Sequence, residues 1–331
     1  MSGLVEIKNL SVDIVKGRGA KAKTLPILRH IDLSVEKGQV LGLVGESGCG
    51  KTMSVLALLG LLPEGGRISS GQLFFQGRDI TNLPRREMEA IRGKHITMIF
   101  QEPMTSLNPL LSIGEQMREI LLQHEGLAGK ANKDKCIALL QAVNIPGPEK
   151  IYDYYPFKLS GGMRQRVMIA MALACEPELI IADEPTTALD VTTQAQILDL
   201  FDEIRRRINS SFIFVTHDLG VISEIADRTA VLYAGYVMEE CSAADLFEKS
   251  LHPYTDGLMR SRVGRKAGNR GQLYSIPGTV PLPGTVIEGC PFAARCEYRT
   301  PRCDNEVPPL IETIETGKDH KVRCWRYHHG G

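Results

Sequence analysis

A glycine-rich segment that ends in lysine and threonine is the first part of the sequence that could do chemistry. Gly45, Glu46, Ser47, Gly48, Cys49, Gly50, Lys51 and Thr52 fit the pattern GxxxxGK[ST]. A strand-like run, 39–45, precedes it and a helix-like run, 51–62, follows. Backbone amides of such a loop surround phosphates, the lysine reaches the β- and γ-phosphates, and the threonine hydroxyl binds Mg²⁺. The segment predicts a nucleoside triphosphate site, and the simpler alternative is a glycine-rich turn before a helix.

Two acidic residues follow another apolar run. Residues 179–182 are Leu-Ile-Ile-Ala, and Asp183 and Glu184 come next. The end of a buried strand places Asp183 at the sheet edge where the phosphate loop is expected, so it could hold Mg²⁺. Glu184 points elsewhere and suits a general base that polarises the attacking water. The alternative is a solvated acidic turn.

A serine and two glycines precede a helix-like run at 163–174. Leu159 is followed by Ser160, Gly161 and Gly162. Serine is a favoured helix N-cap, and this segment could be nothing more than a cap. The backbone amides at a helix start, with the positive end of the helix dipole, also form an anion site. The sequence therefore allows a second phosphate-binding segment here.

The elements that must position these residues alternate between strand and helix. Besides 39–45 and 179–182, strand-like runs occupy 96–100, 212–216 and 230–233. Buried strands with helices between them predict an α/β fold with a mostly parallel sheet. The first 35 residues have short alternating runs, which favour antiparallel strands at one edge. After residue 254 the chain becomes rich in proline, so we expect little regular structure there.

Composition limits the class of protein. The 331 residues suggest about two domains, and 43% hydrophobic content is ordinary for a globular chain. Lys plus Arg and Asp plus Glu are 39 each, which argues against a strongly basic nucleic-acid surface. The longest apolar run, 55–62, is far shorter than the ~20 residues that span a bilayer, and the N-terminus lacks a signal-peptide pattern. We therefore expect a cytoplasmic protein.

Four of the eight cysteines crowd near the end of the chain. They are Cys290, Cys296, Cys303 and Cys324, with the spacing C-x5-C-x6-C-x20-C. This is too wide for the paired knuckles of most zinc sites, and it differs from the usual ferredoxin patterns. Zinc, an iron–sulfur cluster and four unliganded thiols all remain open on spacing alone.

With the phosphate loop, the LSGG at 159–162 resembles the signature of the ATP-binding-cassette (ABC) family. Three more residues resemble family positions, in the expected order. Gln101 resembles the Q-loop glutamine, which contacts Mg²⁺ and the attacking water. Asp190 resembles the D-loop residue, and His217 resembles the switch histidine at the γ-phosphate. The resemblance covers about residues 3–240. It implies an ATPase whose Ser160, Gly161 and Gly162 complete the ATP site of a partner subunit.

Other segments are similar to the oligopeptide/dipeptide importer ATPases. They are Gln101–Pro109 (QEPMTSLNP), the His-Pro-Tyr at 252–254, and the Cys-Pro-Phe at 290–292 with Arg295 and Cys296. The resemblance implies a nucleotide-binding domain at 1–255, with a helical subdomain at about 102–176, and a C-terminal extension at 256–331. It also implies that the four late cysteines hold a 4Fe–4S cluster that staples the extension.

The resemblance further implies a complex at the cytoplasmic face of the cell membrane. Its other members are a paralogous ABC ATPase, two transmembrane permeases and an extracytoplasmic solute-binding protein. Nickel or another metal chelate is an alternative cargo. A nucleic-acid- or ribosome-associated ABC ATPase is an alternative class, but such proteins usually carry two cassettes or long coiled coils, which this chain does not show.

Overall fold

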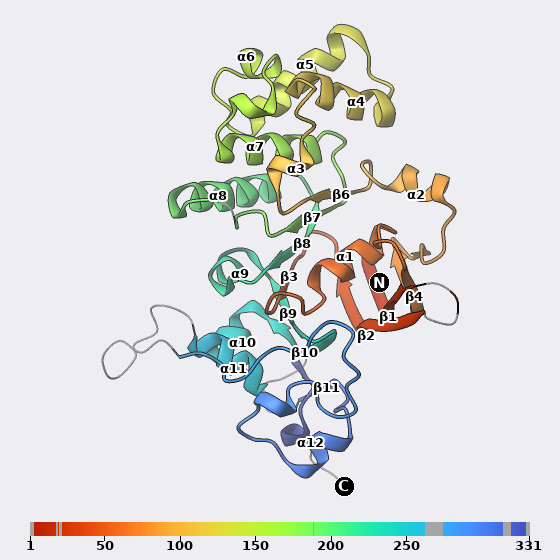
Figure 1. Ribbon diagram of the computed structural model, residues 1–331. Helices are drawn as coiled ribbons and strands as arrows, with labels where there is room; N and C mark the ends of the chain where they lie inside the picture. Colours follow the sequence, from red (N-terminus) through yellow and green to blue (C-terminus); the bar gives the residue numbers. More distant parts are fainter. Residues whose placement is uncertain are drawn as a thin grey trace. The chain divides into compact units, whose positions relative to one another are not determined.

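The computed structural model describes residues 3–17, 19, 22–187, 189–261, 274–313 and 319–328. Backbone contacts divide the chain into two compact units. The first comprises Met1–Val35, Val40–Thr81 and Val215–Gly331, and the second comprises Glu36–Gln39 and Asn82–Phe214. Figure 1 follows the chain through both units. Within the described ranges, none of the helices combines the length and the apolar character needed to cross a bilayer.

An antiparallel sheet forms one layer of the first unit. Its strands are β1 (Val5–Lys16), β2 (Lys23–Val35), β4 (Gly66–Phe75) and β5 (Arg78–Asp79), in the order β2-β1-β4-β5. Val5 pairs with both Val35 and Phe75, so β1 is a central strand. The side chains of Leu10, Val12, Leu28 and Ile31 are fully buried on this sheet. The antiparallel strands expected from the first 35 residues are present, and β4 and β5 extend them.

The larger sheet of the first unit mixes both strand directions. Strand β3 (Val40–Val44) runs parallel to β9 (Arg228–Tyr233), while β10 (Tyr236–Ser242) runs antiparallel to β9. Two short strands continue from β10, namely β12 (Lys321–Val322) and β11 (Ile311–Glu312), both antiparallel. All five residues of β3 are buried, which fits a central strand without polar alternation. The helices of this unit are α1 (Lys51–Leu58), α9 (Leu219–Ile225), α10 (Ala243–Glu248), α11 (Pro253–Arg260) and α12 (Pro301–Asn305).

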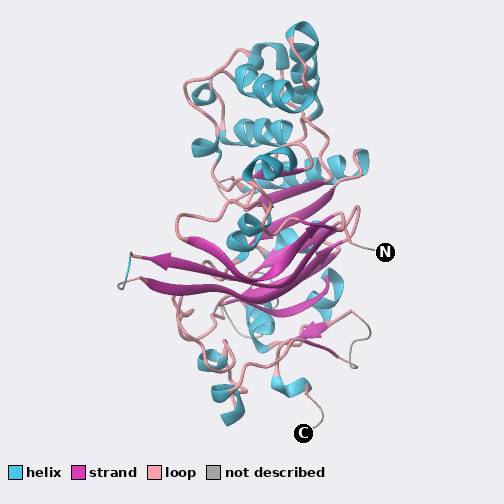
Figure 2. Cartoon of the chain, turned by 90° about the vertical axis from the view of Figure 1, so that its right-hand side faces the viewer, coloured by secondary structure: helices cyan, strands magenta, loops and turns pink. Residues whose placement is uncertain are grey.

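The second unit combines a parallel strand pair with helices. Strand β6 (Ile96–Ile99) pairs in parallel with β7 (Leu179–Asp183). The helices, which Figure 2 draws in cyan, are α2 (Arg85–Ile91), α3 (Pro103–Ser106), α4 (Ile113–Glu125), α5 (Gly129–Ala142), α6 (Pro148–Tyr152), α7 (Gly161–Ala172) and α8 (Val191–Arg207). Strand β8 (Ser211–Thr216) crosses the boundary between the units. Helix α4 begins at a capping box of Ser112 and Glu115.

The described part of the C-terminal segment contains only short elements, as its proline content predicts. Besides α12, β11 and β12, it has two single turns, η3 (Ala293–Arg295) and η4 (Trp325–Tyr327). Val322 of β12 is fully buried against β10, and Arg323 donates to the backbone oxygen of Val237 at 2.8 Å. The segment is thus attached to the first unit by strand pairing and a buried arginine.

Candidate functional site

The phosphate loop joins β3 to α1 in the first unit. Gly45 and Gly50 have φ angles of 152° and 108°, which favour glycine. A Cβ at Gly45 would lie 2.2 Å from the backbone oxygen of Leu232, and one at Gly50 would lie 2.6 Å from Cδ2 of Leu28. Gly50 caps α1 and has no side chain to occupy the first amides of the helix. Close packing therefore excludes a side chain at both glycines. The start of α1 has backbone N–H groups in their place, which is the arrangement that binds phosphate.

Lys51 lies over the loop and is nearly buried. Its Nζ donates to the backbone oxygens of Gly45 at 2.7 Å and Glu46 at 3.2 Å. The neighbouring Cys49 is also buried, and this burial raises the pKa of its thiol, with the charge of Lys51 as a smaller opposing effect. Cys49 is thus a small protonated residue inside the loop, and the cation available to phosphates here is Lys51. Thr52 follows in the first turn of α1 and is exposed.

Strand β7 ends in one of the two acids, and the other follows it directly. Asp183 is the buried last residue of the strand. Glu184 has a φ of 46°, a conformation that costs energy for a residue with a Cβ and often marks functional sites. Its Oε2 accepts hydrogen bonds from Nε2 of Gln101 at 3.0 Å and from Oγ1 of Thr187 at 2.9 Å. The structure thus brings together the predicted base and the predicted Q-loop glutamine within the second unit.

The LSGG segment forms the start of α7. Ser160 is the N-cap, and its Oγ accepts from the backbone N–H of Met163 at 3.3 Å. Gly161 and Gly162 form the first turn, and a Cβ at Gly162 would lie 2.7 Å from Cγ2 of Thr193 in α8. A Cβ at Gly161 would come no closer than 3.8 Å to Leu189. The second glycine is therefore required by close packing against α8, while the first is not.

Asp190 connects to this packing through the same threonine. It caps α8 and accepts hydrogen bonds from the backbone N–H and Oγ1 of Thr193, at 2.9 and 2.8 Å. These bonds, led by the backbone amide, lower the pKa of the Asp190 carboxyl. Asp190 therefore fixes the threonine methyl that packs on Gly162. Thr193 thus lies against both Asp190 and Gly162, a connection that the spacing in the sequence did not show.

His217 lies in the first unit, just after β8, and is exposed. The next residue, Asp218, caps α9, with its Oδ1 accepting from the N–H of Gly220 at 2.7 Å. The N–H of Asp218 in turn donates to Oγ1 of Thr216 at 3.0 Å. The strand end and the helix cap thus fix the backbone on both sides of His217.

The four late cysteines line one cavity of about 230 Å³ in the first unit. Its other lining residues include His252, Pro253 and Phe292. Four thiols around one cavity are a donor set that both zinc and iron–sulfur groups take.

Burial changes the acidity of these thiols. It raises the pKa of Cys290 to about 12 and also raises the pKa of Cys296 and Cys324. Thiols bind metals as thiolates, so a group in this cavity must displace their protons.

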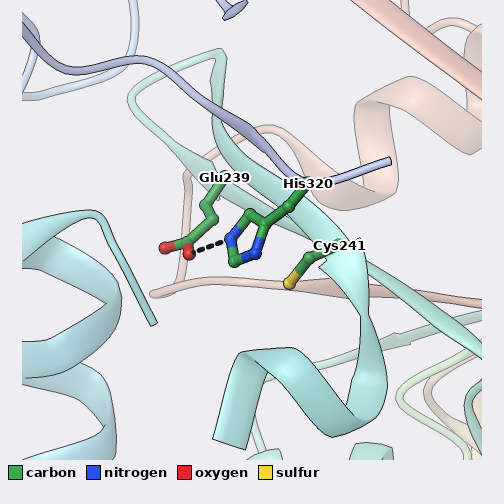
Figure 3. A group of neighbouring side chains, drawn as sticks. All are labelled: Glu239, Cys241 and His320. Carbon is green, nitrogen blue, oxygen red and sulfur yellow. Dashed lines mark hydrogen bonds and ion pairs between the residues drawn. The ribbon is translucent and has the colours of Figure 1, made fainter. Parts of the chain in front are cut away.

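A second group of metal-type side chains joins the C-terminal segment to β10. Figure 3 shows Glu239, Cys241 and His320, whose ligand atoms lie within 4.8 Å of one another. All three are buried, and Nε2 of His320 lies 2.7 Å from Oε1 of Glu239. The same carboxylate accepts the backbone N–H groups of Leu251 at 2.7 Å and His252 at 2.9 Å. Because two backbone N–H groups and the His320 ring already contact its oxygens, we interpret the group as a structural latch for the extension. Sequence analysis did not identify it.

Comparisons with known proteins identify the family of this chain. Residues 28–187 match the family model described as ABC transporter, and residues 238–303 match the oligopeptide/dipeptide transporter C-terminal region. The ATP-binding cassette MJ0796, in its dimeric post-hydrolysis structure with ADP and Pi, has a TM-score of 0.63 at 27% identity. That likeness covers 72% of this chain and 98% of the cassette.

Two relatives from Bacillus subtilis match along the whole chain. The oligopeptide transport ATP-binding protein AppD is 44% identical, covering 100% of this chain and 99% of its own length. The dipeptide transport ATP-binding protein DppD is 45% identical, with 98% and 95% covered. The protein is therefore an ABC transporter ATPase, an enzyme that couples ATP hydrolysis to transport. Within that family it belongs with the ATPases that carry the oligopeptide/dipeptide transporter C-terminal region.

Proposed function

We propose that this chain is the ATP-binding subunit of an importer for dipeptides or oligopeptides. The observation that carries the proposal is the similarity to peptide transport ATP-binding proteins along the full length, including the C-terminal region. The nickel-chelate and nucleic-acid alternatives have no such support among these relatives. The chain would act at the cytoplasmic face of the membrane, with two permease subunits and a solute-binding protein.

Each nucleotide residue has a proposed role. The amides of 45–50 and Nζ of Lys51 hold the phosphates, and His217 contacts the γ-phosphate. Thr52, Asp183 and Gln101 would hold Mg²⁺, which offsets phosphate charge when bound. The buried carboxylate of Asp183 fits such a ligand. Glu184 accepts the proton of the attacking water, and its hydrogen bonds from Gln101 and Thr187 orient it for this.

The signature segment serves the nucleotide of a second cassette. The dimeric MJ0796 structures support an arrangement of two cassettes in this family. We infer that Ser160, Gly161 and Gly162 complete the partner's site, and that Asp190 supports them through Thr193. The partner is a paralogous ABC ATPase. Binding of ATP would draw the two cassettes together, and hydrolysis would release them.

The proposed domains are a cassette at 1–255, with a helical subdomain at about 102–176, and an extension at 256–331. In the extension, Cys290, Cys296, Cys303 and Cys324 would hold a 4Fe–4S cluster, because all four line one cavity. Metal–thiolate bonds would supply folding energy to a segment with only short elements.

The experiment uses the assembled complex. A tag on this chain should co-purify two membrane permeases and a second ATPase. In proteoliposomes with the solute-binding protein, MgATP should drive uptake of a labelled tripeptide, while a nickel chelate should give no uptake above background. Bound RNA without permeases, or ATP-driven uptake of nickel instead of peptide, would contradict the proposal.

A further inference from the structure

The phosphate loop is held by two residues of the C-terminal region. The backbone N–H of Glu46 donates to Oη of Tyr254 at 2.9 Å. The carboxylate of Glu46 pairs with Arg295, with NH1 2.7 Å from Oε2 and NH2 3.2 Å from Oε1. Glu46 is therefore fixed both at its backbone and at its side chain, and its carboxylate is directed to the extension.

Burial and several hydrogen bonds hold the side chain of Arg295 in one position. Its side chain is only 4% exposed. Its guanidinium also donates to the backbone oxygens of Pro277 at 2.9 Å and Ile276 at 3.3 Å, and to Oη of Tyr233 at 3.3 Å. The planar guanidinium group binds all these acceptors at once, which the single ammonium group of lysine cannot do. The bidentate pair thus sets both the distance and the orientation of Glu46.

Tyr254 is equally constrained. It is fully buried, and its ring lies 4.7 Å from that of Tyr233 and 5.4 Å from that of Phe292. Since aromatic packing fixes the ring, the hydroxyl has a defined place for the N–H of Glu46.

The position of Glu46 matters for Lys51. The backbone oxygens of Gly45 and Glu46 are the acceptors that hold Nζ of Lys51. A shift of Glu46 would therefore move the groups that orient the phosphate-binding cation.

The same two segments also line the four-cysteine cavity. Pro253 and Cys296 line it, while their neighbours Tyr254 and Arg295 hold Glu46. Phe292 lines the cavity and packs on Tyr254. A change in what fills the cavity would thus act on both contacts to the phosphate loop.

We propose that Arg295 and Tyr254 are positioning residues that link the state of the four-cysteine cavity to nucleotide affinity. The proposal rests on the nucleotide site and cysteine site of the proposed function. Because coupling between two sites is reciprocal, nucleotide should also change the reactivity of the cavity thiols. The extension would then be a regulator of ATP binding as well as an attached segment.

The test measures the Kd for a non-hydrolysable ATP analogue with Mg²⁺ on full-length protein purified without air. Arg295→Lys and Tyr254→Phe should each raise Kd, Arg295→Lys by roughly tenfold for the loss of a charge-assisted pair. The matched control is Arg299→Lys, because Arg299 also pairs with a carboxylate, Asp304, but that partner lies within the extension. It should leave Kd unchanged. In the assembled transporter, KM for ATP should rise while kcat changes less than about twofold, a split that simple instability would not produce.

Coupling is tested by a double-mutant cycle. Cys296→Ser should raise Kd in the wild-type background and should have little further effect in Arg295→Lys, since the link is already broken. Unchanged Kd in both Arg295→Lys and Tyr254→Phe overturns the positioning role. An unchanged Kd in Cys296→Ser, or full additivity with Arg295→Lys, overturns the link. If the wild-type protein binds no nucleotide, the proposed function itself fails, and this result is distinguishable from both others.

Discussion

The Oε2 atom of Glu184 lies 3.0 Å from Nε2 of Gln101 and accepts a hydrogen bond from it. The two residues are 83 positions apart and come from segments after β7 and β6, which pair in parallel. The parallel pairing brings the ends of both strands to one edge, so Gln101 can orient the carboxylate of Glu184.

Replacing Glu184 with glutamine should slow ATP hydrolysis without weakening nucleotide binding. The amide oxygen can still accept from Gln101 and Thr187, so the local geometry should persist while the general base is lost. We expect the ATPase rate of the assembled transporter to fall by ~10²–10⁴, with unchanged nucleotide Kd. The control is Glu176→Gln, an exposed glutamate that also has a positive φ of 50°. A wild-type rate in Glu184→Gln would show that the base is another group.

Removal of the phosphate-loop lysine should weaken the binding of nucleotide. Lys51→Ala deletes the cation that Gly45 and Glu46 hold over the loop. We expect the Kd for MgATP to rise at least tenfold, as lost charge-assisted bonds to phosphate predict. Isothermal titration of the purified chain measures this, with the exposed Lys37→Ala as control. Equal affinities in the two variants would contradict the assignment.

The two signature glycines should respond differently to a methyl group. Gly162→Ala places Cβ 2.7 Å from Cγ2 of Thr193, while Gly161→Ala meets nothing closer than 3.8 Å. We expect Gly162→Ala to impair ATP-dependent association of two cassettes, measured by light scattering with a slowly hydrolysing variant. The Kd of the single chain should not change. Adding Thr193→Ser removes the methyl, keeps the hydroxyl that bonds Asp190, and should restore association. No rescue would contradict the packing explanation.

Protein purified without air should contain about four iron and four sulfide per chain, with absorbance near ~400 nm. Changing any one of Cys290, Cys296, Cys303 or Cys324 to serine should remove the colour, because each thiol lines the cavity. Cys175→Ser is the control, since that cysteine lies in the other unit. One tightly bound zinc, or no metal in a folded extension, would exclude the cluster.

The buried latch should be needed for the extension to stay attached. Glu239→Ala leaves the N–H groups of Leu251 and His252 and Nε2 of His320 without their acceptor. We expect a loss of roughly 3 kcal/mol in the free energy of unfolding, as for a broken buried polar network. Urea unfolding and proteolysis of the extension measure this, with exposed Glu312→Ala as control. Equal stability and protection in the two variants would contradict a latch.

The sequence by itself identified the candidate residues whose positions depend only on residues nearby in the sequence. The phosphate loop, the acids at the end of β7 and the LSGG cap are each contained in eight residues or fewer, and their backbone geometry follows from strand, turn and helix start. The residue types at those spacings therefore predicted both the fold class and the chemistry. The separate roles predicted for Asp183 and Glu184 likewise rest on their positions at and just after the strand end.

Only the tertiary structure decided the long-range pairs. Arg295 and Glu46 are 249 positions apart, and His320 and Glu239 are 81 apart. Nothing in the spacing relates them, because the path of the chain through β9, β10 and the irregular extension brings them together. A buried arginine or histidine becomes informative once its partner is known, since burial of a charge or polar group requires one. The contact between the cysteine segment and the phosphate loop is therefore a property of packing, which no local pattern contains.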